Sequence, residues 1–399
     1  MTDATATDRP LRVLLWHWGR RGGGPRYTLE LARALSQRDD VAVYLSLSRQ
    51  AEIANEYRAL EAEDSWFVDT YENLWQFGLR SLFLPVLRRR FLRYIRDNRI
   101  DVVLCTMDHL WNAFIVGGVR STGASYMLTV HDAVRHPGEE RWPRNQLLAQ
   151  DIKAADGVLT LTESVRGLLN ERHGFPRRRT WVAPHGVFSY GHPAEPRRLP
   201  ADRPPRLLFF GRILPYKGLD VFLQAVAALH ERGLKVDVEI WGSGSMEGLC
   251  HLLPEAECLR LENRWIAEEE IPEILRRSDI CVLPYREASQ SGVLPTVFAA
   301  GIPAVLTPVA GLREQATEGH NALFAPAINA EAVAETLYRL IQDPELYQRL
   351  SAGAVQTATE DYDWKAIAQT VSEALYDLVE LGERSPNDTG SRGLKRVRH

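Results

Sequence analysis

The chain has 399 residues, of which 45% are hydrophobic and 25% are charged. This length is sufficient for two domains with cores of their own, and the composition excludes a disordered or fibrous protein. The formal net charge is −4 and the pI is near 6.3. With no helix-turn-helix or zinc pattern in the sequence, this balance gives no reason to expect nucleic acid as a partner.

The N-terminal sequence MTDATATDRP has neither the basic nor the apolar region of a signal peptide. No stretch approaches the ~20 apolar residues of a membrane-spanning helix. The sequence has four cysteines, which are Cys105, Cys250, Cys258 and Cys281. They show no metal-ligand spacing and three lie in apolar surroundings, so we expect reduced, structural thiols. The sequence therefore predicts a cytoplasmic protein and leaves contact with a membrane surface open.

The first half of the chain alternates apolar segments with amphipathic ones, which predicts a doubly wound parallel sheet. We expect strands at residues 11–16, 41–47, 102–106, 125–130 and 158–162. The first is followed by GRRGGGPRYTLELARAL, in which a glycine run precedes a helical apolar stripe. Gly23 and Gly24 belong to this run, which by itself indicates a flexible glycine turn before the helix.

The segment 73–96, which begins at Asn73 and ends at Arg96, interleaves aromatic and aliphatic residues with six arginines. Such a segment can dock on anionic lipid, with aromatic rings inserted and arginines at the level of the head groups. It can equally be helix packed on the sheet with an arginine-rich outer face. Packing is favoured, because the apolar positions are too dense for a helix with one buried side and Pro85 interrupts it.

The sequence LLFFGRILPYKG at residues 207–218 is the most informative part of the second half. Four apolar residues indicate a buried parallel strand, which breaks at Gly211 into a loop that carries Arg212 and Lys217. A helix follows from residue 219 and ends near Gly233. Gly211 lets the backbone approach a ligand closely, and the two cations and the helix N-terminus then face the same crevice. This combination suits a diphosphate.

Two further loops of the second half carry candidate binding residues. The sequence VDVEIWGSGS predicts a strand that ends in a G-x-G turn at Gly242, which is a weak signal by itself. Further strands are expected at 262–265 and 280–283. In the following PYREASQSGVLPTVF, the residues Ser291, Gly292 and Val293 form a loop whose backbone N–H groups can face an anion or sugar hydroxyls. We expect a short helix from about residue 294 to 301, and longer ones at 331–350 and 365–381.

The sequence GRILPYKG resembles the GR-x(n)-KG signature of the retaining GT-B glycosyltransferases grouped as family 4. Further pieces of that family's pattern occur in the same order over nearly the whole chain. In the family the first glycine loop lies in the interdomain cleft near the phosphates and the acceptor, so the resemblance makes Gly23 and Gly24 candidate binding residues. His131 and Asp132, which follow the expected strand 125–130, resemble the family's HD pair, whose histidine contacts the donor sugar near the reacting carbon. The segment at His185, HGV, resembles the family's N-G-V, with histidine in place of asparagine.

The stretch after residue 284 resembles the family's E-x7-E region but departs from it. By the spacing to the following GIP sequence, the family's first acid falls on or beside Glu287, and the ribose-binding second acid falls on Thr296. The stretch is similar to an SQSGV variant of some members, in which loop amides and the first acid still hold the sugar. A threonine hydroxyl gives the ribose one hydrogen bond where a carboxylate gives a charge-assisted pair.

The resemblance implies a GT-B fold of the α/β class, with two Rossmann-like domains of doubly wound parallel sheet that face a cleft. The implied organisation is an acceptor-side domain at 1–190, a linker at 191–205 and a nucleotide-sugar domain at 206–361. A final helix at 362–381 then crosses back to the first domain. Residues 382–399 have almost no apolar content, which predicts a disordered basic tail.

The implied activity is transfer of a sugar from a UDP- or GDP-sugar to a hydroxyl of a glycan, a lipid-linked glycan or another acceptor. The nucleotide sugar is a co-substrate, and no cofactor or metal is expected because neither cleft loop has a D-x-D pattern. Arg212 and Lys217 would stabilise the leaving diphosphate. No carboxylate pair suggests double displacement, so the same-face mechanism proposed for the family is the better hypothesis.

Two alternatives stay open from the sequence. One is another enzyme of the same architecture, a nucleotide-sugar epimerase or a phosphorylase, although the extra cleft acids of the first and the pyridoxal-bound lysine of the second have no clear signature. The other is an inactive nucleotide-sugar-binding or scaffold protein that lost turnover with the acid at position 296. The sequence does not identify the sugar, the acceptor, the linkage formed or the oligomeric state.

Overall fold

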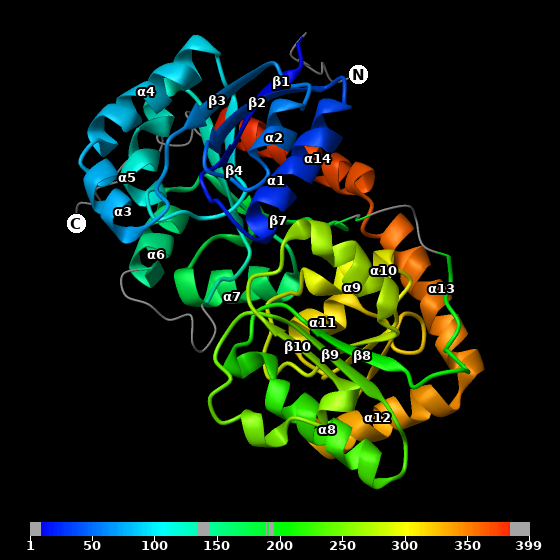
Figure 1. Cartoon of the computed structure of the whole chain (residues 1–399). Helices are drawn as coiled ribbons and strands as arrows, with labels where there is room; N and C mark the ends of the chain where they lie inside the picture. The colour runs from blue at the N-terminus through cyan, green and yellow to red at the C-terminus, as the bar shows by residue number, and fades with distance from the viewer. Residues whose placement is uncertain (1–8, 135–143, 189, 191–194, 384–399) are drawn as a thin grey trace, which may run out of the picture.

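The computed structural model describes residues 9–134, 144–188, 190 and 195–383. Two parallel sheets, each covered by helices on both faces, lie one after the other in the chain (Figure 1). The first has the order β3-β2-β1-β4-β5-β6-β7 and the second has the order β10-β9-β8-β11-β12-β13. We refer to the parts built on them as the first and second domains.

The elements of the first domain are the strands β1 (Leu11–His17), β2 (Val41–Ser48), β3 (Asp64–Val68), β4 (Val102–Cys105), β5 (Ser125–Val130), β6 (Gly157–Thr160) and β7 (Thr180–Val182) and the helices α1 (Gly23–Ser36), α2 (Ala54–Arg58), α3 (Leu74–Ser81), α4 (Leu84–Asp97), α5 (Asn112–Ile115), α6 (Arg144–Ala154) and α7 (Glu163–His173). Short 3-10 turns lie at Val116–Thr122 and Arg177–Arg179.

The elements of the second domain are the strands β8 (Arg206–Phe210), β9 (Asp237–Gly242), β10 (Leu259–Asn263), β11 (Ile280–Leu283), β12 (Ala304–Leu306) and β13 (Ala322–Phe324) and the helices α8 (Leu219–Glu231), α9 (Ile271–Arg277), α10 (Val293–Ala299), α11 (Ala310–Gln315), α12 (Ala330–Gln342) and α13 (Pro344–Glu360), followed by α14 (Trp364–Glu383). Its 3-10 turns lie at Pro215–Lys217, Cys250–Leu252, Ala256–Cys258 and Glu268–Glu270.

Each sheet is buried on both faces, which explains why its strands read as continuous apolar runs. In β1, Val13 and Leu15 face a core shared with α1 and α14, whereas Leu14 and Trp16 face a second core shared with α4, α6 and α7. In β8, alternate residues likewise face α8 and α12 on one side and α9 and α10 on the other. This alternation is the two-residue period of a strand. The predicted fold class is confirmed.

Strand and helix bounds differ from the expectations in a few places. The short strands β3, β7, β12 and β13 were not expected, because runs of three to five residues give little periodic signal. Strand β10 lies at Leu259–Asn263, ahead of the predicted 262–265. The helix expected at 331–350 is two helices, since Asp343 caps α13 and Pro344 opens it.

The chain passes from the second domain back to the first between Tyr362 and Trp364. Tyr362 belongs to a core of the second domain and Trp364 to a core of the first, where α14 packs beside α1 (Figure 1). The indole of Trp364 donates a hydrogen bond to the carbonyl of Val187 at 2.7 Å. A Cβ on Gly186 would lie 2.4 Å from this ring, so only glycine fits there. The described part of the predicted linker, 195–205, is fixed to the second domain by Arg197.

Four smaller expectations can be compared with the structure. All four cysteines are free thiols, but two are buried and not three: Cys105 and Cys281 are buried, whereas Cys250 is exposed and Cys258 is half-buried. None of the helices that the structure describes is long and apolar enough to cross a bilayer. The first two residues of the predicted basic tail, 382 and 383, belong to α14, and the rest of it lies outside the described residues.

Candidate active site in the cleft between the sheets

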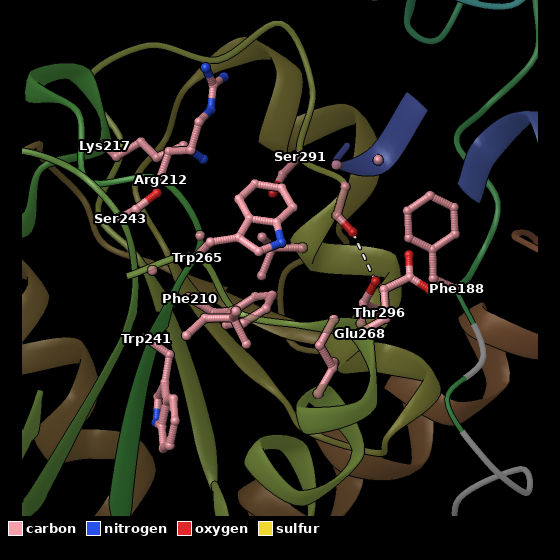
Figure 2. Close-up of a pocket in the computed structure, with 18 of the residues that line it drawn as sticks. Phe188, Phe210, Arg212, Lys217, Trp241, Ser243, Trp265, Glu268, Ser291 and Thr296 are labelled. Atoms are coloured by element: carbon pink, nitrogen blue, oxygen red, sulfur yellow. Dashed lines mark hydrogen bonds between the residues drawn. The ribbon is translucent and has the colours of Figure 1, made fainter. Parts of the chain in front are cut away.

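A cavity of about 370 Å³ lies between the two domains. Its walls are loops that follow the carboxyl ends of strands in both sheets, which is where open α/β sheets bind ligands. Ten of the twelve predicted site residues line it, namely Gly23, His131, Gly211, Arg212, Lys217, Gly242, Ser291, Gly292, Val293 and Thr296. Figure 2 shows several of these side chains around the cavity, with the indole of Trp265 projecting into it.

The loops after β8 and β9 touch each other through their backbones. Gly242 has a φ of +154°, and a Cβ there would lie 1.7 Å from the carbonyl oxygen of Gly211. A Cβ on Gly244 would lie 2.0 Å from the carbonyl oxygen of Ile213, whose N–H donates to Ser243 at 2.8 Å. The G-x-G turn, weak as a sequence signal, is therefore required by the contact between two cavity loops.

Lys217 is a buried cation at the cavity wall. Its Nζ donates a hydrogen bond to the Tyr285 hydroxyl at 2.7 Å and lies 4.2 Å from the centre of that ring. The turn that carries it is fixed by Arg286, which donates to the Pro215 carbonyl and forms a two-bond ion pair with Asp220. Lys217 is thus held in place before any ligand arrives.

Arg212 lies on the same wall and is exposed (Figure 2). The two predicted cations therefore share one cavity but differ in burial. Tyr285 and Arg286, which order this wall, were not predicted as site residues, because a tyrosine and an arginine after a buried strand have no distinctive spacing.

The loop before α10 corrects one expectation about backbone donors. The Ser291 N–H donates to the side chain of Gln315 at 2.6 Å, and the Ser291 carbonyl accepts from the same amide at 3.1 Å. Its N–H is therefore bound within the protein, and does not face a ligand as predicted. Gln315 lies 24 residues further along the chain, so this pair of hydrogen bonds could not be predicted from the local sequence.

Thr296, at the position of the family's second acid, is buried on the cavity wall. Its hydroxyl donates to the carbonyl of Gly292 at 3.0 Å, one turn earlier in α10 (Figure 2). The hydroxyl proton is thus engaged, and the oxygen keeps only its capacity to accept a hydrogen bond. A threonine here therefore meets a ligand as an acceptor.

Two histidines of the first domain line the opposite wall. His131 Nε2 lies 2.9 Å from the Thr106 carbonyl, and His185 Nδ1 lies 2.7 Å from the Gly186 carbonyl. Because a carbonyl only accepts, each of these nitrogens carries the ring proton. Burial, with a smaller effect of the nearby His131, lowers the pKa of His185 to about 4. His185 is therefore neutral at physiological pH.

The glycines of the run in the first domain have different surroundings. Gly23 lines the cavity, whereas Gly24 is not among the lining residues. A Cβ on Gly24 would lie 2.8 Å from both the Met107 sulfur and the ring of His17. Gly24 thus makes room for a buried histidine, and the structure explains this residue without a ligand.

The acidic residues differ most from the prediction. Glu287 is exposed and is not among the residues that line the cavity, so its predicted role has no support from the geometry. The carboxylates on the wall belong to Glu52, Asp132 and Glu268. Burial raises the pKa of Glu268 to about 7, although Arg26 opposes this shift. Burial also raises the pKa of Glu52, whose carboxylate accepts from the Gly22 N–H at 2.9 Å.

Direct contacts join the two domains around the cavity. Arg26 of α1 forms an ion pair with Glu268 at 3.2 Å. On another side, Glu314 of α11 accepts hydrogen bonds from the N–H groups of Glu163 and Ser164 and so caps α7. The Thr162 hydroxyl also donates to the Ser289 carbonyl at 2.9 Å. These contacts set the width of the cavity.

Two family models match most of the chain. The model described as Glycosyltransferase Family 4 matches residues 21–188, and the model described as Glycosyl transferases group 1 matches residues 204–343. The chain is 28% identical over 406 residues to a D-inositol 3-phosphate glycosyltransferase of Thermobispora bispora, with 92% of each chain covered. It is 26% identical to the glycogen synthase of Mycobacterium tuberculosis, in a match that spans 65% of this chain and 64% of that protein.

Solved structures agree with this match at the level of the fold. A sucrose-phosphate synthase from Thermosynechococcus elongatus superposes with a TM-score of 0.70 at 17% identity, over 94% of this chain and 100% of the other. Anabaena Alr3699/HepE, in complex with UDP-glucose, gives a TM-score of 0.67 at 14% identity, over 92% and 99%. The matching models, the relatives and the two facing sheets together identify the chain as a GT-B glycosyltransferase of the family 4 type.

Proposed function

We propose that the chain transfers a sugar from a nucleotide-diphosphate sugar to an acceptor hydroxyl with retention of configuration. The observation that carries this proposal is the shared wall of Arg212 and Lys217, next to the glycines of two parallel-sheet loops. Glycine loops admit a pyrophosphate close to the backbone, and paired cations favour its charge. The structure of Anabaena Alr3699/HepE with UDP-glucose supports a UDP-sugar as the first donor to test.

In the proposed reaction, the bond between the sugar and the diphosphate breaks as negative charge develops on the leaving phosphate. Lys217, buried and fixed on Tyr285, stabilises that charge without having to reorganise, and Arg212 adds a second positive charge from the exposed edge. These two groups supply the charge that a metal ion supplies elsewhere, so we expect activity to persist in chelator.

The opposite wall suits the sugar. His131, with its proton on Nε2 held by the Thr106 carbonyl, presents a fixed imidazole on the side away from the cations. On the wall of the second domain, Thr296 accepts a hydrogen bond from the ribose in this scheme. We propose the same-face mechanism, in which the leaving phosphate takes the acceptor proton. Trapping of a covalent glycosyl adduct on this protein would contradict that mechanism.

The experiment that tests donor binding is a thermal-shift panel with UDP, GDP, ADP and their common sugar conjugates. A nucleotide at a hundredfold excess over its dissociation constant adds about 2.7 kcal/mol of stability, which is a readable shift. We expect a shift with one base, smaller in Arg212→Ala and absent in Lys217→Ala. Arg349→Gln, an exposed arginine of α13 remote from the cavity, is the matched control.

Turnover is tested by following donor hydrolysis and transfer to added glycan acceptors. Release of nucleotide that depends on Lys217 supports the enzyme. Binding without any turnover, in the presence or absence of acceptor, would favour a nucleotide-sugar-binding protein. No shift with any nucleotide would reject the proposed donor site.

A further inference from the structure

The helices α3 and α4 lie at the outer edge of the first domain (Figure 1), and they leave a group of large apolar side chains exposed. Six of the exposed large hydrophobic residues lie here: Leu74 (88% exposed), Trp75 (79%), Leu82 (74%), Phe83 (62%), Leu79 and Val86. In α3, Trp75, Leu79 and Leu82 recur at helical spacing and so share one side. We call these six residues the apolar face.

The inner side of the same two helices is packed, so the apolar face is not a loosely placed segment. Phe77 of α3 stacks on Trp111 with ring centres 6.2 Å apart, and the Trp111 indole donates to the Ser81 hydroxyl at 3.0 Å. In α4, Phe91 and Ile95 are fully buried against the sheet. The expectation of a packed segment is therefore correct for one side only, because the apolar residues outnumber the positions that the sheet can cover.

Arginines continue the face along α4. Arg89, Arg90, Arg93 and Arg96 are exposed, and none forms an ion pair with a carboxylate of the described residues. The segment 73–96 has six arginines and no acidic residue, in a chain whose net charge is −4. Apolar side chains therefore lie on α3 and at the start of α4, and arginines without a carboxylate partner among the described residues lie beyond them on α4. This arrangement is typical of a surface that inserts rings between lipids and binds anionic head groups.

We propose that the apolar face docks the protein on an anionic membrane surface. A second copy of the chain is a weaker fit as the occupant, because two such faces would bring the arginines of both copies together without acidic partners. The start of α3 is joined to a loop that lines the cavity. Glu72, next to the start of α3, accepts a hydrogen bond from Arg20, two residues before the cavity residue Gly22. Docking there presents the cavity to acceptors held at the membrane.

Vesicle co-sedimentation of the full chain tests the proposal, and it does not depend on the proposed donor or on turnover. The probes are phosphatidylcholine vesicles with and without phosphatidylglycerol. We expect binding only to the anionic vesicles and weaker binding as salt rises. The double variant Trp75→Ser, Phe83→Ser should reduce binding at least about tenfold, since it removes two inserted rings. The triple variant Arg89→Gln, Arg90→Gln, Arg93→Gln should abolish the preference for anionic lipid.

Matched controls are Ile328→Ser, an exposed isoleucine of the second domain, and Arg349→Gln, and both should bind like the unchanged chain. The substituted side chains are exposed, so an unchanged unfolding temperature separates lost docking from lost folding. Absence of wild-type binding to anionic vesicles, or equal binding of both sets of variants, would overturn the proposal. A dimer in solution that Trp75→Ser, Phe83→Ser dissociates would instead assign the face to a second copy.

Discussion

The two walls of the cavity are built on opposite principles. The wall of the second domain carries fixed positive charge and backbones in direct contact, through Lys217 on Tyr285 and Gly242 on Gly211. The wall of the first domain has no lysine or arginine among its described lining residues and carries aromatic side chains, His185 with its lowered pKa, and the carboxyl groups of Glu52 and Asp132. The second domain is therefore organised for a small anionic group of fixed shape, and the first for a less charged partner.

This difference predicts which wall tolerates substitutions. Backbone contacts between loops leave no room for adjustment, whereas side chains at the end of flexible bonds can move. Substitutions on the second wall should therefore abolish binding, and matched substitutions on the first should weaken stability while leaving nucleotide binding in place. Four variants test this contrast, beginning with the one that has the largest expected effect.

The largest effect is expected for Gly242→Ala. Its Cβ would lie 1.7 Å from a backbone oxygen, so the loops after β8 and β9 must separate. We expect a loss of at least about 3 kcal/mol of unfolding free energy together with nucleotide binding. Gly248→Ala is the control, since Gly248 has a φ of +75° and nothing within 4 Å of its Cβ position. It should lose only about 1 to 2 kcal/mol. Equal losses in chemical denaturation would reject the loop contact as the cause.

Tyr285→Phe sharpens the role of Lys217. The change removes the hydroxyl that accepts from Lys217 Nζ but keeps the ring beneath the cation. We expect nucleotide affinity to fall by a factor of about 5, as for one lost hydrogen bond of about 1 kcal/mol. In a Lys217→Ala background the same substitution should have no further effect, which calorimetric titration of a double-mutant cycle measures. An undiminished effect there would mean that Tyr285 acts independently of Lys217.

Gly24→Ala tests the packing behind the first wall, because Gly24 does not line the cavity itself but lies against Met107, which does. The new methyl meets the ends of two side chains, Met107 and His17, instead of a backbone. We expect a loss of about 1 to 3 kcal/mol from overpacking, read as a lower unfolding temperature. The nucleotide-induced shift should remain. Gly23→Ala, whose Cβ would lie 3.7 Å from Phe188, is the matched control for stability. Loss of nucleotide binding in folded Gly24→Ala would break the contrast between the walls.

The smallest effect concerns Glu268, whose pKa burial raises from 4.5 to about 7. Between these values the folded chain holds a proton that the unfolded chain has released, so stability falls as pH rises through this window. Glu268→Gln should reduce the loss of unfolding free energy across this pH window by about 1 kcal/mol. The effect is this small because water reaches part of the side chain. Unfolding temperatures from pH 4.5 to 8 measure it, with Glu335→Gln of an exposed pair as control. An unchanged slope would place the pKa near its ordinary value.

Much of the fold and part of the site could be predicted from the sequence, because their signals are local. Strand β5 and strand β11 were predicted at their observed bounds, since each is an apolar run that ends at a polar loop. Gly211, Arg212 and Lys217 follow a strand within a few residues, which is a weak signal alone, and the resemblance to the GR-x(n)-KG signature is what made them candidate site residues. Gln315, Tyr285 and Glu268 could not be predicted, because their partners come from other loops.

The sequence by itself determined the alternation of strands and helices, and hence the two parallel sheets and the loops that carry the cations. It did so because burial on two faces of a sheet leaves a pattern in consecutive residues. Only the tertiary structure decided that Gly242 is required by Gly211, that the Ser291 amide is bound within the protein, that Glu287 is outside the cavity and that α3 exposes its apolar side. Each of these depends on which distant segment lies within a few ångströms, and that is set by the packing of the whole chain.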